Sequence, residues 1–258
     1  MGIHLGRPGP QSRIDVASVE LLSPRLPAGL EGFRIALLAD LHFGSLVPLA
    51  YVEHVLAVAA AQRPDLTVFA GDLVENALAA RDGFCQALAD FCRDWPACGV
   101  LGNHDYYGGN ARLRHRLEQC GVRLLVNRSH LFGAAGGGLA VVGLDDINCG
   151  RPDVDAAFAG VPDGAFTVVA GHCPDLADRL DGRRVDLMLA GHTHGGQVCL
   201  LGKALVTFTR NRNYVRGLIR KPGFPLYVSR GLGVTGLPIR IGSDPELPII
   251  TLRRGRQA

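Results

Sequence analysis

The chain has 258 residues, of which 47% are hydrophobic and 20% are charged, and its formal net charge is +3. This composition is typical of a folded protein and excludes a disordered chain, and the length suits one core of large α/β type. The small net charge argues against a specific nucleic-acid partner, which needs a concentrated basic face. We therefore predict a single domain over residues 1–258, with a motif-bearing core at about 33–200 and a β-rich part at about 197–254.

The cysteines and the apolar runs indicate the cellular compartment of the protein. Seven cysteines are scattered without a CxxC pair, which favours free thiols in a reducing compartment over disulfides or a thiolate zinc site. No stretch reaches the roughly 18 consecutive apolar residues of a membrane span, and residues 1–13 lack the apolar segment of a signal peptide. We expect a cytoplasmic protein.

The first predicted elements form a β-α-β unit. Residues 14–23 alternate like a strand and, with a second strand at 33–39, suggest an edge hairpin leading into the core. Residues 48–62 predict a helix, because Pro48 suits a first helical turn. A strand at 65–70 then completes the unit.

Later elements are shorter. Helical spacing of apolar residues predicts helices at about 78–94, 110–119 and 175–180. Apolar runs predict strands at 123–126 and 139–144, on either side of a loop at 133–138. After Gly196 the chain changes to short β segments, which we expect to form a second sheet, at 197–201, 225–229 and 247–252.

Five apolar runs each end in a polar motif. The runs are 35–39, 66–70, 98–101, 166–170 and 187–190. The motifs that follow them, in the same order, are Asp40-Leu41-His42, Gly71-Asp72, Gly102-Asn103-His104-Asp105, Gly171-His172 and Gly191-His192-Thr193-His194. Such runs are typical of buried parallel strands, whose carboxyl ends meet at one edge of a sheet, where open α/β folds bind ligands. We expect the five motifs to cluster at that edge.

The side chains of these motifs are oxygen and nitrogen donors. Asp, Asn and His suit Mn²⁺, Fe, Zn²⁺ or Mg²⁺. Two ions need a bridging carboxylate, which Asp72 offers after a glycine that permits close backbone approach. Five of the nine histidines lie in the motifs, which disfavours a purely structural explanation.

The ordered motif set resembles the calcineurin-like metallophosphoesterase superfamily, over about residues 14–254. The blocks at 191–197 (Gly-His-Thr-His-Gly-Gly-Gln) and 227–233 (Tyr-Val-Ser-Arg-Gly-Leu-Gly) resemble a narrower bacterial branch, the YkuE/YaeI-like phosphodiesterases. The resemblance implies an α/β fold, a four-layer αββα sandwich of two mixed β-sheets flanked by helices, with a dinuclear metal site at strand ends.

Carried onto this sequence, the resemblance implies two metal positions that share one carboxylate. One position would use Asp40, His42, Asp72 and His194, and the other Asp72, Asn103, His172 and His192. The two divalent ions would hold a hydroxide for in-line attack on phosphorus. The catalytic pair would be His104, which protonates the leaving oxygen, and Asp105, the carboxylate that orients His104.

These residues predict a metal-dependent phosphoric ester hydrolase, most simply a phosphodiesterase. One alternative is a UDP-2,3-diacylglucosamine pyrophosphatase of lipid A synthesis, which would need an apolar groove or lid; the segment 201–219 is the best candidate for one. Another alternative is a non-catalytic metal-binding scaffold. Such scaffolds usually lose a ligand or the acid histidine, and here His104 and every ligand are present.

A basic segment follows the last metal motif. It contains Arg210, Arg212, Arg216, Arg220 and Lys221. These side chains are either solvated loop charges or a surface for an anionic substrate or membrane. We accordingly expect a small-molecule or lipid-linked phosphate ester as substrate, with peripheral contact to the inner face of an anionic membrane as a hypothesis.

Four residues near the motifs have two interpretations each. Arg230 either reaches a phosphate or forms a structural ion pair. Gln197 either belongs to a tight turn or bonds a ligand histidine or the substrate. Tyr106 and Tyr107 either wall the cleft or pack in the core.

Overall fold

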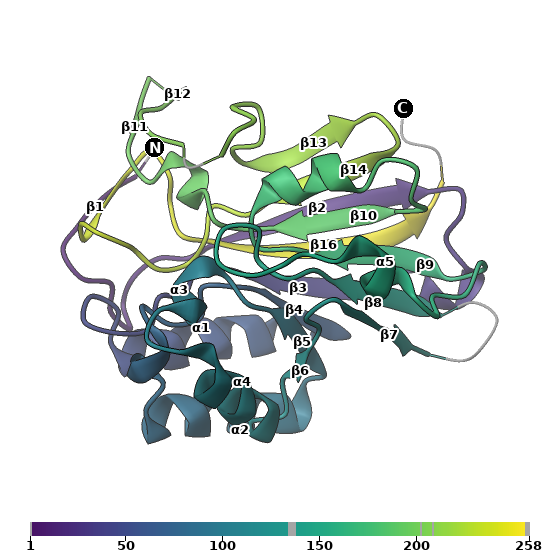
Figure 1. Ribbon diagram of the computed structural model, residues 1–258. Helices are drawn as coiled ribbons and strands as arrows, with labels where there is room; N and C mark the ends of the chain where they lie inside the picture. Colours follow the sequence, from purple (N-terminus) through teal and green to yellow (C-terminus); the bar gives the residue numbers. More distant parts are fainter. Residues whose placement is uncertain (1, 134–137, 202, 208, 256–258) are drawn as a thin grey trace.

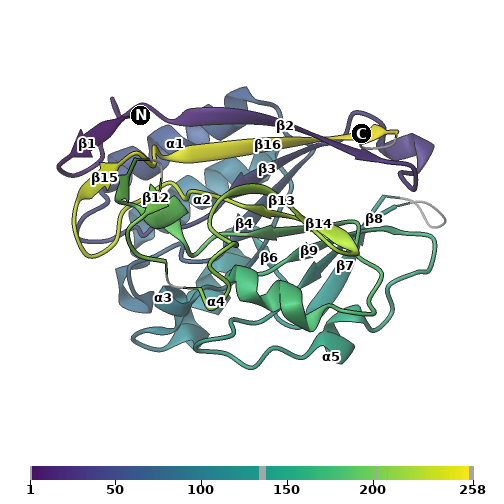
Figure 2. The ribbon, with the colours of Figure 1, turned by 90° about the horizontal axis from the view of Figure 1, so that it is seen from above.

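Two six-stranded sheets lie face to face between helices in the computed structural model, which describes residues 2–133, 138–201, 203–207 and 209–255 (Figures 1 and 2). Both sheets contain parallel and antiparallel pairs. The predicted four-layer αββα architecture is therefore confirmed. Residues 134–137 of the predicted loop at 133–138 lie outside the described residues.

The first sheet carries the motifs nearer the start of the chain. Its strands, in spatial order, are β2 (Asp15–Ser23), β16 (Glu246–Arg254), β3 (Arg34–Leu38), β4 (Leu66–Ala70), β5 (Ala97–Val100) and β6 (Arg123–Leu124). All neighbours run parallel except β16 and β3. Its outer face packs against α1 (Leu49–Ala61), α2 (Asp82–Asp94) and α4 (Asn110–Gln119).

The second sheet carries the later motifs. Its order is β13 (Gly217–Lys221), β14 (Phe224–Val228), β10 (Leu187–Ala190), β9 (Phe166–Ala170), β8 (Leu139–Gly143) and β7 (Arg128–Phe132). The four inner strands run parallel, and the two outer strands are antiparallel to their neighbours. Its outer face packs against α5 (Val154–Phe158) and the 3₁₀ helix η3 (Pro174–Arg179).

Alternation along the central strands separates the layers. Leu38 and Phe69 face the helices, whereas Leu37 and Val68 belong to the cluster between the sheets. Because successive strand residues point to opposite faces, a strand that is buried on both sides must be apolar throughout. This explains why the five runs before the motifs are almost continuous hydrophobic segments.

Two predictions of strand pairing are wrong. Residues 14–23 form an edge strand but no hairpin with 33–39, because β16 lies between β2 and β3. The three β segments predicted after Gly196 do not form one sheet: β14 joins the second sheet and β16 joins the first. The segment 197–201 contributes only β11 (Cys199–Leu200), which pairs with β12 (Lys203–Ala204). When a strand pairs with a partner that is distant in the chain, its local sequence carries no signal of that pairing.

The remaining elements are short. They are β1 (Ile3–Leu5), which pairs with β15 (Ile239–Ile241), the helix α3 (Asn103–Tyr106), and the 3₁₀ turns η1 (Ala28–Leu30), η2 (Ala77–Ala79) and η4 (His194–Gly196). The helix expected from about 78 begins only at Asp82, after η2. In the described part of the chain, no helix is both long and apolar enough to cross a membrane.

Candidate metal centre and active-site cleft

The predicted ligand motifs meet where strands of both sheets end. Three follow β3, β4 and β5 of the first sheet, and two follow β9 and β10 of the second (Figure 1). The prediction that all five strand ends share one sheet edge is therefore wrong. Doubly covered strands have the same apolar pattern in either sheet, so the runs could not reveal how they are divided.

Three groups of side chains could hold an ion. One, made of His42, Asp72 and His104, overlaps the other two, which match the predicted metal positions and which we call the first and the second group. In the first group, His194 Nε2 lies 3.0 Å from His42 Nε2 and 3.8 Å from Asp40 Oδ1. In the second group, His172 Nε2 lies 3.2 Å from Asp72 Oδ2 and 3.2 Å from His192 Nδ1. Each group thus turns its donor atoms toward a common point, as ligands of one ion do.

Asp72 connects the two groups. Its Oδ2 lies 3.5 Å from His42 Nε2 and 3.2 Å from His172 Nε2, so one oxygen faces both. Its other oxygen accepts a hydrogen bond from the backbone N–H of His104 at 2.8 Å. Gly71 makes room for this arrangement: its φ is +86°, and a Cβ there would lie 2.5 Å from the Gly102 nitrogen.

Two further features of the second group fit a bound cation. Asn103 Oδ1 is buried and makes no hydrogen bond to any described residue, while its Nδ2 donates to the Tyr107 hydroxyl at 3.2 Å. His172 Nδ1 donates to the Ala70 carbonyl at 2.8 Å, which leaves Nε2 as a ligand atom. An orphaned buried oxygen and an oriented imidazole are what a bound cation requires.

Backbone conformation marks the same residues. Among the described residues, nine other than glycine have a positive φ, and five of these are predicted ligands: Asp40, His42, Asp72, His192 and His194. The left-handed region is sparsely populated by such residues, and this strain collects at functional sites. The turns after the strands therefore aim the ligands at a conformational cost.

Burial controls the charges of this cluster. Burial raises the pKa of Asp40 to about 7, although the neighbouring His172 opposes the shift. Burial lowers the pKa of His42 to about 3. Burial also disfavours the charged forms of Asp72 and His172, but their mutual attraction outweighs it, so the Asp72 pKa is low and the His172 pKa rises to about 10. The cluster thus keeps a positive charge on His172 beside the buried Asp72 carboxylate, and a bound cation would supply that charge in its place.

His104 and Asp105 do not pair as predicted. His104 Nδ1 donates to the Glu75 backbone carbonyl at 3.0 Å. The Asp105 carboxylate instead accepts from the backbone N–H groups of Gly102 at 2.9 Å and Val74 at 3.2 Å. The prediction that Asp105 orients the His104 ring is wrong, because a backbone carbonyl occupies that position. Asp105 braces the loop that carries the histidine.

A cleft of about 530 Å³ opens over the cluster. Asp72, His104 and His192 line one part of it, and an apolar part follows. The apolar part is lined by Val198, Leu205, Val206, Gly236 and Leu237. Donor atoms for cations and space for an organic group thus lie in one cleft.

Contacts near the cleft decide part of the open alternatives, and a contact of Gln197 with the substrate stays a prediction. Tyr107 lines the cleft, whereas the Tyr106 hydroxyl donates to the Asp145 carboxylate. Gln197 also lines the cleft, and its amide bonds the backbone at Thr235 and Leu237 rather than a ligand histidine. Arg230 forms ion pairs with Asp15 and Glu246, the structural alternative.

Comparison with known proteins identifies the family. A family model for calcineurin-like phosphoesterases matches residues 33–196. The chain belongs to this family. It is 30% identical to the uncharacterized metallophosphoesterase YkuE of Bacillus subtilis, over 93% of this chain and 86% of that protein. It is 31% identical to the phosphodiesterase YaeI of Escherichia coli, over 85% of this chain and 82% of that protein.

A solved structure supports the fold alone. The NAD nucleotidase NadN of Haemophilus influenzae superposes with a TM-score of 0.52 at 17% sequence identity. The match covers 77% of this chain and 45% of that chain. Members of the phosphoesterase family act on phosphoester bonds and typically bind two divalent metals, which agrees with the cluster described above.

Sequence reasoning missed one buried cation of this phosphoesterase. Arg240 is 1% exposed, and its guanidinium lies 3.2 Å from His194 Nδ1. It also donates to the carbonyls of Gly233, Arg230 and Ser243. Arg240 therefore ties the loop between β14 and β16 to the metal cluster. An arginine within an alternating segment gives no sequence signal of this role.

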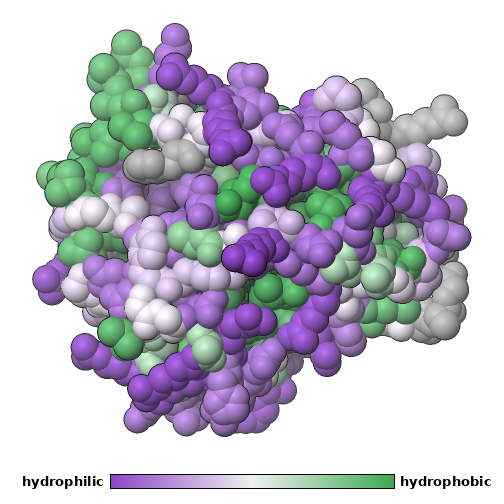
Figure 3. Space-filling model, in the orientation of Figure 1, coloured by the Kyte–Doolittle hydropathy of each residue, from purple (hydrophilic) through white to green (hydrophobic). Residues whose placement is uncertain are grey.

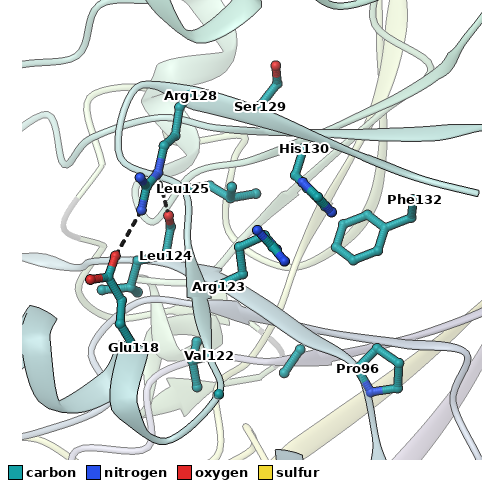
Figure 4. Close-up of a pocket in the computed structure, with 12 residues that line it drawn as sticks. Pro96, Glu118, Val122, Arg123, Leu124, Leu125, Arg128, Ser129, His130 and Phe132 are labelled. Atoms are coloured by element: carbon teal, nitrogen blue, oxygen red, sulfur yellow. Dashed lines mark hydrogen bonds and ion pairs between the residues drawn. The ribbon is translucent and has the colours of Figure 1, made fainter.

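A second hollow lies away from the metal cluster. It has a volume of about 690 Å³ and is lined by residues of β6, β7 and their neighbours, with none of the predicted ligands among them. Figure 4 shows Arg123, His130 and Phe132 around it, and Arg128 held by Glu118 and the Leu124 carbonyl. The hollow is therefore separate from the cleft over the ligand cluster.

Proposed function

We propose that this protein is a phosphodiesterase that uses two divalent cations. The observation that carries the proposal is the position of Asp72. One of its carboxylate oxygens, Oδ2, faces the histidines of both ligand groups. The similarity to YaeI, named a phosphodiesterase, supports it. Mn²⁺, Zn²⁺, Fe and Mg²⁺ all match the donor set.

The residues divide into ligands and an acid. Asp40, His42 and His194 would hold one cation, and His172, His192 and Asn103 the other, with Asp72 between them. When bound, the cations polarise the phosphoryl oxygens and make water a nucleophile near neutral pH. Because His104 Nδ1 is engaged by Glu75, the ring in its cationic form can give the proton on Nε2 to the leaving oxygen.

The lining of the cleft favours a diester over a monoester. Among the described residues that line it, none is a lysine or an arginine. A monoester dianion carries a second negative charge that such side chains would normally bind. A diester has one negative charge and a second organic group, which the apolar part of the cleft suits.

The test compares two chromogenic esters. Metal-stripped protein refilled with Mn²⁺ should hydrolyse bis(p-nitrophenyl) phosphate at least about tenfold faster than p-nitrophenyl phosphate, a difference of about 1.4 kcal/mol in barrier. The stripped protein is the control and should be inactive. Faster hydrolysis of the monoester would contradict the proposal.

A second candidate function is favoured by the apolar part of the cleft. A UDP-2,3-diacylglucosamine pyrophosphatase would place an acyl chain beside Leu205 and Leu237. Including that substrate in the comparison tests it, since strong turnover of the lipid nucleotide would replace the first proposal. Inactivity on all three esters with two cations bound would favour a metal-binding scaffold.

A further inference from the structure

The outer rim of the cleft exposes large apolar side chains. It consists of Leu205, Val206 and Leu237, which line the cleft, and of Leu200 and Leu201 in the neighbouring β11–β12 ribbon, each more than half exposed. We call these five residues the apolar rim. Leu201, at the end of the β11–β12 ribbon, is 92% exposed. Burial of such side chains stabilises a fold, so their exposure beside a catalytic cleft indicates contact with a partner.

The apolar rim is one connected surface. The backbone N–H of Leu205 donates to Val198 at 3.1 Å, and the Gln197 side chain donates to the Leu237 carbonyl at 3.1 Å. Strand β15, just after Leu237, pairs with β1, which adds the exposed Ile3 and Leu5. Figure 3 shows hydrophobic side chains gathered at the corner where Figure 1 places β1, β11 and β12.

Leu201 is held in an unfavourable conformation. Its φ is +48°, a value that glycine or asparagine adopts more easily than leucine. Neither packing nor backbone geometry therefore explains a leucine at this position. An apolar side chain presented at the tip of a ribbon suits insertion into a lipid layer.

A basic hollow lies directly behind the rim. This basic hollow has a volume of about 580 Å³, and Leu205 and Val206 line both it and the catalytic cleft. The hollow is also lined by Lys203, Arg212 and Arg216, and no described residue of its lining is acidic. Cations beside exposed leucines complement the phosphates and acyl chains of an anionic lipid surface.

We propose that the apolar rim docks the protein on an anionic lipid surface, with the leucines in the acyl layer and Lys203 and Arg212 against headgroup phosphates. The cleft would then receive the phosphoester of an amphiphile from that surface. The identity of the substrate rests on the proposed function, whereas docking does not. The hollow contains Arg212 and Arg216 of the basic segment expected from sequence, whereas Lys221 of that segment pairs with Asp181 at 2.6 Å.

Vesicle flotation tests the docking. The metal-loaded protein should float with vesicles of equimolar phosphatidylcholine and phosphatidylglycerol and not with phosphatidylcholine alone. L200S/L201N should bind on the order of a hundredfold more weakly, because two leucines are withdrawn from the lipid. K203Q/R212Q should bind on the order of tenfold more weakly.

The controls separate docking from folding and from catalysis. L218S alters a partly exposed leucine of β13 outside the rim and should float like the wild type. Equal thermal unfolding midpoints verify that the variants fold. Absence of wild-type flotation, or equal flotation of L200S/L201N, would overturn the proposal. Loss of a dimer in L200S/L201N, without vesicle binding by the wild type, would overturn it in favour of a second copy.

Hydrolysis of soluble bis(p-nitrophenyl) phosphate by the wild type reports separately on the proposed function. A protein that floats and leaves this diester intact retains the docking surface and loses the phosphodiesterase assignment. A protein that cleaves the diester and does not float retains the phosphodiesterase assignment and loses the docking surface.

Discussion

The floor and the rim of the cleft are built in opposite ways. The floor, formed by the predicted ligands, is buried except for the half-buried His192, and it is hydrogen-bonded and held by left-handed turns after central strands. The rim exposes leucines on short two-stranded ribbons. In the proposed function, the floor carries the chemistry and the rim selects the molecule that reaches it.

This contrast matches the rigidity that each task requires. Ligands must keep their positions to within a fraction of an ångström, so they stand on strands that pack on both faces. A docking surface needs only exposed apolar area and complementary charge. Substitutions in the floor should therefore affect chemistry with every substrate, and substitutions in the rim should affect only some substrates.

The largest effect is expected at the residue shared by both ligand groups. Asp72→Asn removes the carboxylate that faces His42 and His172, so cation binding should fall below two per chain. Turnover should fall by more than the 10–100-fold typical of residues that only support a ligand. Metal content by mass spectrometry and diester hydrolysis measure this. Asp163→Asn, at an exposed acid, is the matched control; two cations and full activity in Asp72→Asn would refute the bridging role.

The next effect separates binding of cations from proton transfer. The His104→Gln variant should keep both cations. Its turnover of alkyl diesters, whose leaving group needs a proton, should fall by about 10²–10⁴-fold. The loss should be smaller for p-nitrophenyl esters, which leave readily. His115→Gln on the surface of α4 is the control. An unchanged rate on alkyl diesters would exclude His104 as the acid.

A third variant tests how the floor is attached to the rest of the fold. Arg240→Met should lower the free energy of unfolding by about 3–5 kcal/mol, because it leaves buried carbonyls without a donor. Urea denaturation measures this value. Arg184→Met, at an exposed arginine, should change it little. A loss below about 1 kcal/mol would show that Arg240 is not a structural anchor.

The smallest effect is expected on the rim side of the cleft. Leu205→Ala should raise KM several-fold, up to about tenfold, for a diester with a long alkyl group, because apolar contact area is lost. The KM for a methyl diester should stay the same. Leu218→Ala is the control. Equal KM changes for both diesters would show that the apolar part of the cleft does not select the substrate.

The floor could be predicted from sequence because its signal is local. Each ligand motif directly follows an apolar run, and Asp40, Asp72 and His172 are residue types that commonly bind metal ions. The orientation of His104 could not be predicted, because its partner is the backbone carbonyl of Glu75. Arg240 was missed because its contact with His194 spans 46 positions of the chain.

The arrangement of the sheets was only partly predictable. The sequence indicated the strands, and the family resemblance implied two layers, but the insertion of β16 between β2 and β3 depends on a pairing across most of the chain. The rim was predicted in part, because the segment 201–219, the candidate apolar groove, contains Leu201, Leu205 and Val206. Leu237 lies outside that segment, and only its exposure and its place in the cleft distinguish it from a core leucine.

The most direct test of the account is a titration of metal-stripped protein with Mn²⁺ while hydrolysis of bis(p-nitrophenyl) phosphate is followed. If Asp72 joins two cation positions, the rate should rise until two equivalents per chain are bound and then level off. Full activity at one equivalent, or no hydrolysis with two cations bound, would contradict the two-cation phosphodiesterase.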